Sequence, residues 1–266
     1  MSFDISIVVP CFNEEASLAH LHQRIGAMRT LLENHNLHII LVDDGSTDRT
    51  WPILRQLFGG RSDCTLVRHP TNLGIGAAIL TGIRAAQTEI VCSIDCDCTY
   101  DPCQLSLLLP KLTSNVDLIT GSPYHPEGRV LGVPLWRAFL SKAASALYRC
   151  VLRQKLYTYT SCFRVYRRAA ILQLELKRSD FLAIAELIGK LDLNGFHVAE
   201  CPATLTVRSH GLSKMKTFRV LAGHLDLLCE LLVLRCRQLV ATFISTRFLL
   251  DPAPSEKQRE NRRRKD

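Results

Sequence analysis

Short apolar runs recur along the first part of the chain, and each is followed by polar residues and a longer amphipathic segment. The runs occupy residues 5–9, 38–42, 64–68 and 90–94 and are rich in Val, Ile and Leu. Runs of this length predict buried strands, and the segments between them predict helices. This alternation predicts an α/β fold, a Rossmann-like and mainly parallel sheet flanked by helices. Ligands of such sheets bind at the carboxyl ends of the strands.

Polar residues stand where the first two runs end. Pro10, Phe12 and Glu14 follow the first run, and Asp43 and Asp44 follow the second. Acidic residues and Ser or Thr then continue each segment, as is typical of helix amino termini. We expect both loops to lie at the carboxyl edge of the sheet, where they are candidates for binding a nucleotide.

The fourth run leads directly to two carboxylates, Asp95 and Asp97, which are separated by one residue. Alternate residues of an extended strand share a face, so the two side chains are predicted to point the same way. Mg²⁺ commonly takes one or two carboxylates together with substrate phosphates. Alone, this Asp-x-Asp pattern is more typical of a polar turn. Three such clusters at one edge instead predict a nucleotide site that holds Mg²⁺ or Mn²⁺ at Asp95 and Asp97.

Two other cofactor classes are not expected. Gly74 and Gly76 stand at a helix start, but Ile79 occupies the third position of a Gly-x-Gly-x-x-Gly pattern, which argues against a dinucleotide. The eleven cysteines are odd in number and form no paired Cys-x-x-Cys, which argues against structural zinc. The chain opens on a predicted strand rather than a signal peptide, so we expect reduced thiols and a cytoplasmic location.

The order of four motifs resembles the inverting family 2 glycosyltransferases, which have an A-type nucleotide-sugar-binding fold. These motifs are residues 10–14, 43–46, 72–74 and 95–97. The resemblance continues into the polyprenol-phosphate mannose synthase branch and spans about residues 5–216. The motifs that carry this second part are Gly121–Tyr124, Trp136–Arg137, Glu186, Glu200–Pro202, Arg208 and Gly211–Lys214.

The resemblance implies a role for each matching residue. The residues that would bind the donor are Pro10, Phe12, Glu14, Asp43, Asp44, Asp95 and Asp97. The residues that would bind the phosphates of donor and acceptor are Arg137, Arg208, Ser213 and Lys214. Within these sets, Asp97, Arg208 and Lys214 would be catalytic. Guanidinium groups suit phosphate oxygens, and a lysine adds a point charge.

The implied activity is inverting, metal-dependent transfer of mannose or glucose from GDP-mannose or UDP-glucose to a polyprenyl phosphate. Two positions depart from the synthase pattern, since Thr99 stands where a Gln is usual and Pro123 where an Arg is usual. Arg129 is a candidate to replace the missing charge. Two alternatives stay open. One is transfer to a sugar hydroxyl with Glu186 or Asp180 as base, and the other is a non-catalytic nucleotide-sugar-binding protein.

Charge is distributed unevenly along the chain. Of the net charge of +8, the segment from residue 208 onward contributes thirteen Lys or Arg against six Asp or Glu, so residues 1–207 are near neutral. This asymmetry predicts contact with an anionic membrane surface rather than with nucleic acid, because aromatic residues are not interleaved with the basic ones. We expect a catalytic domain over 1–216, amphipathic helices over 217–250 and a charged disordered tail over 251–266.

Residues 134–155 predict one amphipathic helix. Its polar stripe consists of Arg137, Ser141, Ser145, Arg149 and Arg153. The opposite face carries Trp136, Phe139, Leu140, Leu147 and Val151. The pattern allows either a helix packed on the sheet or one that contacts a membrane. Together with the helices of 218–250, it predicts a protein held peripherally on the inner face of the membrane.

Overall fold

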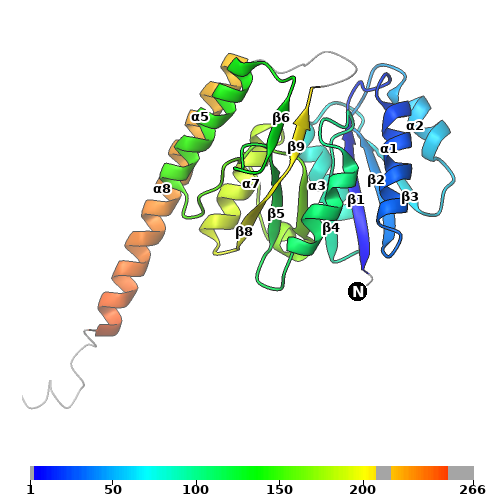
Figure 1. Cartoon of the computed structure of the whole chain (residues 1–266). Coiled ribbons are helices and arrows are strands. Elements are labelled where there is room, and N and C mark those ends of the chain that lie inside the picture. Colours follow the sequence, from blue (N-terminus) through cyan, green and yellow to red (C-terminus); the bar gives the residue numbers. More distant parts are fainter. Residues whose placement is uncertain (1–2, 208–216, 251–266) are drawn as a thin grey trace, which may run out of the picture. The chain divides into compact units, whose positions relative to one another are not determined.

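The computed structural model describes residues 3–207 and 217–250, and within them the side chains of Leu135, Arg137, 217–221 and 241–250 are not described. The chain divides into two units, and the first ends at Leu228. This first unit contains a sheet with helices on both faces (Figure 1).

The sheet of the first unit has seven strands in the order β3-β2-β1-β4-β7-β5-β8. The strands are β1 (Asp4–Cys11), β2 (Asn36–Asp43), β3 (Cys64–Arg68), β4 (Ile90–Ser93), β5 (Leu118–Ser122), β7 (Arg164–Arg167) and β8 (Val198–Pro202). β7 is antiparallel to both of its neighbours, and the other pairs are parallel. The predicted mainly parallel sheet is therefore confirmed, and all four predicted strands are present.

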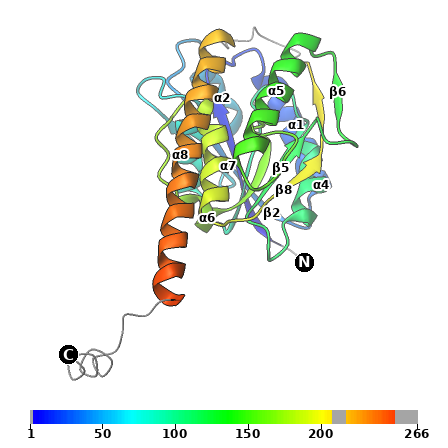
Figure 2. The ribbon, with the colours of Figure 1, turned by 90° about the vertical axis from the view of Figure 1, so that its left-hand side faces the viewer.

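Two helical layers cover this sheet. The first layer comprises α1 (Leu18–Leu31), α2 (Thr50–Phe58) and the short helices η1 (Pro102–Gln104), α4 (Leu105–Leu108) and η2 (Leu109–Lys111). The second comprises α3 (Ile75–Ala85), α6 (Arg168–Leu172) and α7 (Leu182–Leu193). Figure 2 shows α7 in front of the sheet and α1 behind it.

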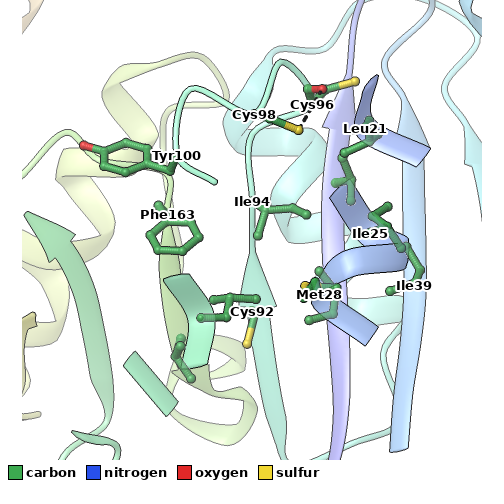
Figure 3. Close-up of a cluster of buried hydrophobic side chains, with 14 of the residues drawn as sticks. Leu21, Ile25, Met28, Ile39, Cys92, Ile94, Cys96, Cys98, Tyr100 and Phe163 are labelled. Carbon is green, nitrogen blue, oxygen red and sulfur yellow. Dashed lines mark hydrogen bonds between the residues drawn. The ribbon is translucent and has the colours of Figure 1, made fainter. Parts of the chain in front are cut away.

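The alternation of side chains along β1 explains both layers. Ile5, Ile7 and Val9 point towards α1 and are buried in the larger apolar cluster. Val8 points the other way, towards α3, where a Cβ added to Gly82 would lie 2.3 Å from its Cγ1. Figure 3 shows Leu21, Ile25 and Met28 of α1 in the same apolar cluster as Ile94, the residue that follows β4. Both faces of β1 are thus buried, as expected for a central parallel strand.

A second, two-stranded sheet lies beyond the carboxyl edge of the first. It pairs β6 (Arg129–Leu131) with β9 (Thr204–Thr206). The backbone NH of Thr206 donates to the Thr99 carbonyl at 2.9 Å, and Tyr100 forms an isolated bridge with Leu205. The Tyr100 ring also stacks on Phe163 with centroids 5.2 Å apart (Figure 3). These contacts fix the segment that follows β4.

In helix α5 (Leu135–Val151), the buried and exposed faces are not those that the polar and apolar periodicity indicated. Tyr148 and Ser145, the latter from the predicted polar stripe, are buried. Trp136, Phe139 and Leu147, from the predicted apolar face, are exposed. The helix therefore packs through a small and partly polar face, and its large apolar side chains reach solvent.

One continuous helix, α8 (Thr217–Leu250), occupies the region where one or two helices were expected. Its part up to Leu228 belongs to the first unit. His224 Nδ1 lies 2.9 Å from the Tyr148 hydroxyl, and Asp226 pairs with Arg178 at 2.6 Å. Among the helices of the described residues, none is both long and apolar enough to cross a membrane. The predicted tail, 251–266, lies outside the described residues.

Candidate functional site

The Asp95 and Asp97 carboxylates lie in a tight turn at the end of β4. The strand itself ends at Ser93, so the predicted extended alternation does not reach the two aspartates. The turn closes through a hydrogen bond from the Cys98 NH to the Asp95 carbonyl at 3.1 Å, and Cys98 has a φ of 54°. The Thr99 NH then donates to Asp97 Oδ1 at 3.1 Å. Both carboxylates are half-buried at the carboxyl edge of the sheet.

The loops after β1 and β2 are joined by hydrogen bonds. Cys11 pairs with Asp43 in the parallel register, which places the two loops side by side. The Asn13 NH donates to Ser46 Oγ at 2.9 Å, and the Asn13 side chain accepts from the Thr47 NH at 2.8 Å. Asn13 has a φ of 52°, in the left-handed region that Asn tolerates better than most residues.

The predicted donor residues of the first loop have different surroundings. Pro10 and Phe12 are half-buried, whereas Glu14 is buried. The Glu14 carboxylate accepts from Ser17 Oγ at 2.9 Å, and its NH donates to Thr50 Oγ1 at 2.7 Å. The Glu14 side chain therefore stabilises the start of α1 in this structure.

The Asp44 carboxylate holds the loop that leads into α3. It lies 2.7 Å from His69 Nδ1 and accepts from Asn72 Nδ2 at 2.9 Å. The NH groups of Leu73 and Gly74 donate to its two oxygens at 2.9 and 2.8 Å. Four partners occupy its acceptor positions, so a direct contact with a nucleoside would require one of them to be exchanged.

Gly45 allows the loop after β2 to lie very close to the backbone of Thr71. Its φ is 69°, and a Cβ at this position would lie 2.3 Å from the Thr71 carbonyl carbon. Only glycine fits such an approach without moving the backbone. The neighbouring Asp43 is fully buried, and its Oδ2 lies 2.9 Å from Arg68 Nε. Asp43 Oδ2 has no hydrogen-bond partner among the described residues, so this contact is an ion pair alone.

A cavity of about 210 Å³ opens beside Asp95. Hydroxyl groups and aromatic rings from five segments of the chain line it. Its lining residues are Asp95, Thr99, Tyr100, Pro123, Tyr124, Ser141, Thr158, Thr160, Ser161, Cys162, Phe181 and Leu205. The positions that depart from the synthase pattern, Thr99 and Pro123, are both among them. A larger space of about 820 Å³ lies at the amino ends of the strands, around Asp4 and Glu89. We place function at the smaller cavity, because parallel sheets bind ligands at their carboxyl edge.

Two charged residues, the half-buried Glu200 and the buried Arg164, support the loop that forms one wall of this cavity. The Glu200 carboxylate accepts from the NH groups of Tyr157 and Thr158 at 2.7 and 2.8 Å, and burial raises its pKa. Arg164 is fully buried and donates to the carbonyls of Tyr159 and Ile184 at 3.0 and 2.9 Å. Burial lowers the pKa of Arg164.

Sequence reasoning gave Glu200 no role beyond its motif and did not single out Arg164. A charged residue in the apolar context of β7 was the one available signal for Arg164.

The phosphate-binding residues predicted from the resemblance fall outside the described parts of the chain. Arg208, Ser213 and Lys214 lie in the undescribed segment, and only the backbone of Arg137, in α5, is described. Arg129, the candidate replacement for a charge at Pro123, lies on β6 opposite Thr204. Its neighbour Val130 pairs with the cavity residue Leu205, so Arg129 is on the other face of that small sheet.

Comparison with known proteins places this chain among glycosyltransferases. The sequence profile of Glycosyl transferase family 2 matches residues 6–174. The chain is 33% identical over 220 residues to a polyprenol monophosphomannose synthase of Mycolicibacterium smegmatis, covering 79% of this chain and 80% of that protein. It is 28% identical to a dolichol-phosphate mannosyltransferase of Pyrococcus furiosus, covering 80% of this chain but only 59% of the relative. A dodecaprenyl-phosphate galacturonate synthase of Rhizobium johnstonii is 31% identical, with coverages of 88% and 68%.

Solved structures confirm the predicted fold. A glucosyl-3-phosphoglycerate synthase of Mycobacterium tuberculosis, in complex with Mn²⁺, UDP and glucosyl-3-phosphoglycerate, superposes with a TM-score of 0.63 at 20% identity. The match covers 86% of this chain and 80% of that one. A mannosyltransferase of Pyrobaculum calidifontis, in complex with GDP-Man and Mn²⁺, gives a TM-score of 0.58 at 18% identity, with coverages of 84% and 62%.

Proposed function

Because this chain belongs to glycosyl transferase family 2, and resembles its polyprenol-phosphate mannose synthases, we propose that it transfers a hexose from a nucleoside-diphosphate sugar to a polyprenyl phosphate. The observation that carries the proposal is the position of Asp95 and Asp97. Their turn follows β4, which lies in the sheet between β1 and β7. It therefore stands between the loops after β1 and β2, which are the candidates for binding the nucleotide, and a cavity lined with hydroxyl groups. Such a turn lies where the diphosphate of the donor and the phosphate of the acceptor would have to meet.

The oxygen ligands of this turn fit Mg²⁺ or Mn²⁺. Among residues 3–207 and 217–250, no three or more His, Cys, Asp or Glu side chains gather as a metal cluster. Two carboxylates, without a third ligand among the described residues, suit a cation that also binds substrate phosphates. When bound, the cation would stabilise the negative charge of the departing nucleoside diphosphate. We assign its protein ligands to Asp95 and Asp97.

The residues of the chain then orient the two substrates for a single displacement. A phosphate oxygen of the acceptor forms the new bond to the anomeric carbon, and the bond to the donor diphosphate breaks on the opposite side, which inverts the configuration. An anionic phosphate needs no base to activate it. Arg137, Arg208, Ser213 and Lys214 are proposed to bind the phosphate oxygens, where cations stabilise the developing charge.

Transfer to a sugar hydroxyl is less well supported. It needs a carboxylate base, and the first candidate, Glu186, is completely buried. Its carboxylate accepts from the NH groups of Lys177 and Arg178 at 2.8 and 2.9 Å, and it pairs with Lys190 at 3.0 Å. The second candidate, Asp180, accepts from the Leu182 NH at 3.0 Å at the start of α7. These contacts and the burial of Glu186 therefore suit a structural role and not that of a base.

We also propose that the protein associates peripherally with the membrane on its cytoplasmic side. The outward face of α5 supports this, because Phe139 is 70% and Trp136 51% exposed beside the basic residues Lys142 and Arg149. Large apolar side chains flanked by cations suit the boundary between headgroups and acyl chains. A lipid-linked acceptor would be reached from such a surface.

The proposed function is tested by supplying labelled GDP-mannose and UDP-glucose with Mn²⁺ to the full chain in detergent. One set of reactions contains a polyprenyl phosphate, and a matched set contains free sugar acceptors. We expect label in the lipid extract with one of the two donors and none on the free sugars. Transfer to the free sugars alone would refute the proposal, and nucleotide-sugar binding without any transfer would favour the non-catalytic alternative.

A further inference from the structure

We infer that Lys142 binds the phosphate of the lipid acceptor at the mouth of the cavity beside Asp95. This inference rests on the proposed function and adds a binding residue that the sequence patterns did not single out. Lys142 follows Ser141 in α5, and Ser141 lines the cavity. Its Nζ lies 5.4 Å from the ring centre of Tyr124, another lining residue. The contact between the cation and the ring holds the ammonium group near the mouth.

The charge of the cavity creates the need for a cation. Among the described lining residues, Asp95 is the one acidic side chain, and none is Lys, Arg or His. The metal ion proposed at Asp95 and Asp97 would compensate those carboxylates and the donor diphosphate, so an acceptor phosphate that enters as a further anion is still favoured by a cation of its own, and most strongly where the groups are partly removed from water. The described hydroxyl groups can donate hydrogen bonds to phosphate but cannot neutralise it.

Other described cations around the cavity are less suitable. Arg164 lies behind the cavity wall, and its two terminal nitrogens donate to backbone carbonyls. Arg149 stacks over Tyr157, a residue outside the described lining. Arg129 occupies the face of the β6–β9 sheet opposite Leu205. Lys142, by contrast, is exposed and contacts a lining residue.

The position of Lys142 also bears on Pro123, which departs from the synthase pattern. The chain has a proline beside Tyr124, at a position where the resemblance leads one to expect a cation. Lys142 approaches the same short segment from α5 through the Tyr124 ring. A charge supplied from the helix would then serve the position that Pro123 leaves without one.

The test compares Lys142→Met with Lys142→Arg in detergent micelles, with a polyprenyl phosphate as acceptor. Methionine keeps the apolar stem without the charge, and arginine keeps the charge. We expect Lys142→Met to raise the KM for the acceptor at least about fivefold, as for the loss of a partly exposed charge contact. The KM for the donor should change less than about twofold, and Lys142→Arg should restore most of the acceptor affinity. Lys111→Ala, at an exposed lysine outside the described lining, controls for net charge.

Several outcomes would overturn the inference. An unchanged acceptor KM in Lys142→Met would remove Lys142 from the site, as would an equal defect in Lys142→Arg. A change confined to the donor KM would assign the cation to the donor instead. If the unmodified protein transfers nothing to polyprenyl phosphate, the proposed function fails and the inference fails with it. That failure is recognised in the wild-type reaction, before any variant is compared.

Discussion

The Tyr148 hydroxyl lies 2.9 Å from His224 Nδ1 and joins α5 to the beginning of α8. Both side chains are buried, and burial lowers the pKa of His224 although nearby Asp180 opposes that shift. The folded protein therefore binds a proton at His224 less readily than the unfolded chain, in which the pKa of histidine is about 6.5. The part of the free energy of unfolding that depends on neutral His224 is therefore fully present above that pH and is lost as the pH falls through it.

We accordingly expect the free energy of unfolding to fall between about pH 7.5 and pH 5.5, and His224→Gln to flatten this decrease. Urea denaturation at the two pH values measures both slopes. Tyr148→Phe removes the hydrogen bond but keeps the titrating imidazole, so it should lower stability at both pH values and retain the slope. Equal slopes in wild type and His224→Gln would assign the pH dependence to other groups.

Asp44→Asn should destabilise the protein by about 2–4 kcal/mol, because the amide presents a donor where a buried carboxylate accepted four hydrogen bonds. Thermal and urea unfolding measure the change. Glu89→Gln is the comparison, since Glu89 is 74% exposed and makes a surface ion pair with Arg167. That variant should lose less than about 1 kcal/mol. Similar small losses in both would contradict the anchoring role of Asp44.

Asp97→Asn should leave the fold intact and weaken Mn²⁺-dependent binding of a nucleoside diphosphate at least about tenfold. Loss of even an outer-shell partner of a metal can have an effect of that size. Turnover should fall with it, because less metal would be available to stabilise the leaving group. Titration calorimetry with and without Mn²⁺ is the measurement, and Asp4→Asn, at the opposite edge of the sheet, is the control. Unchanged affinity in Asp97→Asn would refute the metal assignment.

Lys214→Ala should reduce kcat at least about tenfold, equivalent to about 1.4 kcal/mol, with little change in vesicle binding. The reason is that a lysine that binds the phosphate oxygens would stabilise the charge developing in the transition state more than the bound substrates. Steady-state kinetics and vesicle sedimentation are measured on the same samples. Lys216→Ala removes the same charge two residues away. A normal kcat with weaker vesicle binding would place Lys214 in the membrane-binding surface.

Phe139→Ser should weaken binding to anionic vesicles about tenfold or more, in line with the free energy of burying an aromatic side chain. The binding that remains should fall as salt screens the basic residues of α5. Co-sedimentation at low and high salt gives both effects. Leu107→Ser is a matched control, because Leu107 is 53% exposed on the separate helix α4. Equal binding by both variants would favour a helix that only packs on the sheet.

The sequence allowed the parallel half of the fold to be predicted because that half depends on local patterns. The apolar runs identified β1 to β4, and the polar residues after them identified the functional edge. The acidic residues themselves were harder to interpret. An aspartate that binds a ligand and one that holds a loop, as Asp44 does, occupy the same position after a strand.

Other features depend on tertiary contacts. Periodicity predicted the two faces of α5, but only packing determines that Phe139 points outward and Ser145 inward. The cavity combines Asp95, Ser141 and Thr160, which come from distant parts of the chain and share no motif. Lys142 contacts the ring of Tyr124, 18 residues earlier in the chain. Such pairs carry no local signal, and one sequence cannot reveal them.

The insertion of β7 between β4 and β5 affects the order in which the molecule can fold. β1 to β4 form one side of the sheet in the order β3-β2-β1-β4, and all four lie within residues 4–93, so they can pair as soon as that part of the chain is available. Ser93 pairs with Arg164, 71 residues later in the chain, so the contact between β4 and β7 must wait until β7 is available. During synthesis the side of the sheet made of β1 to β4, with its candidate nucleotide-binding loops, would therefore form first. The cavity beside Asp95 would be completed only when β7 enters the sheet.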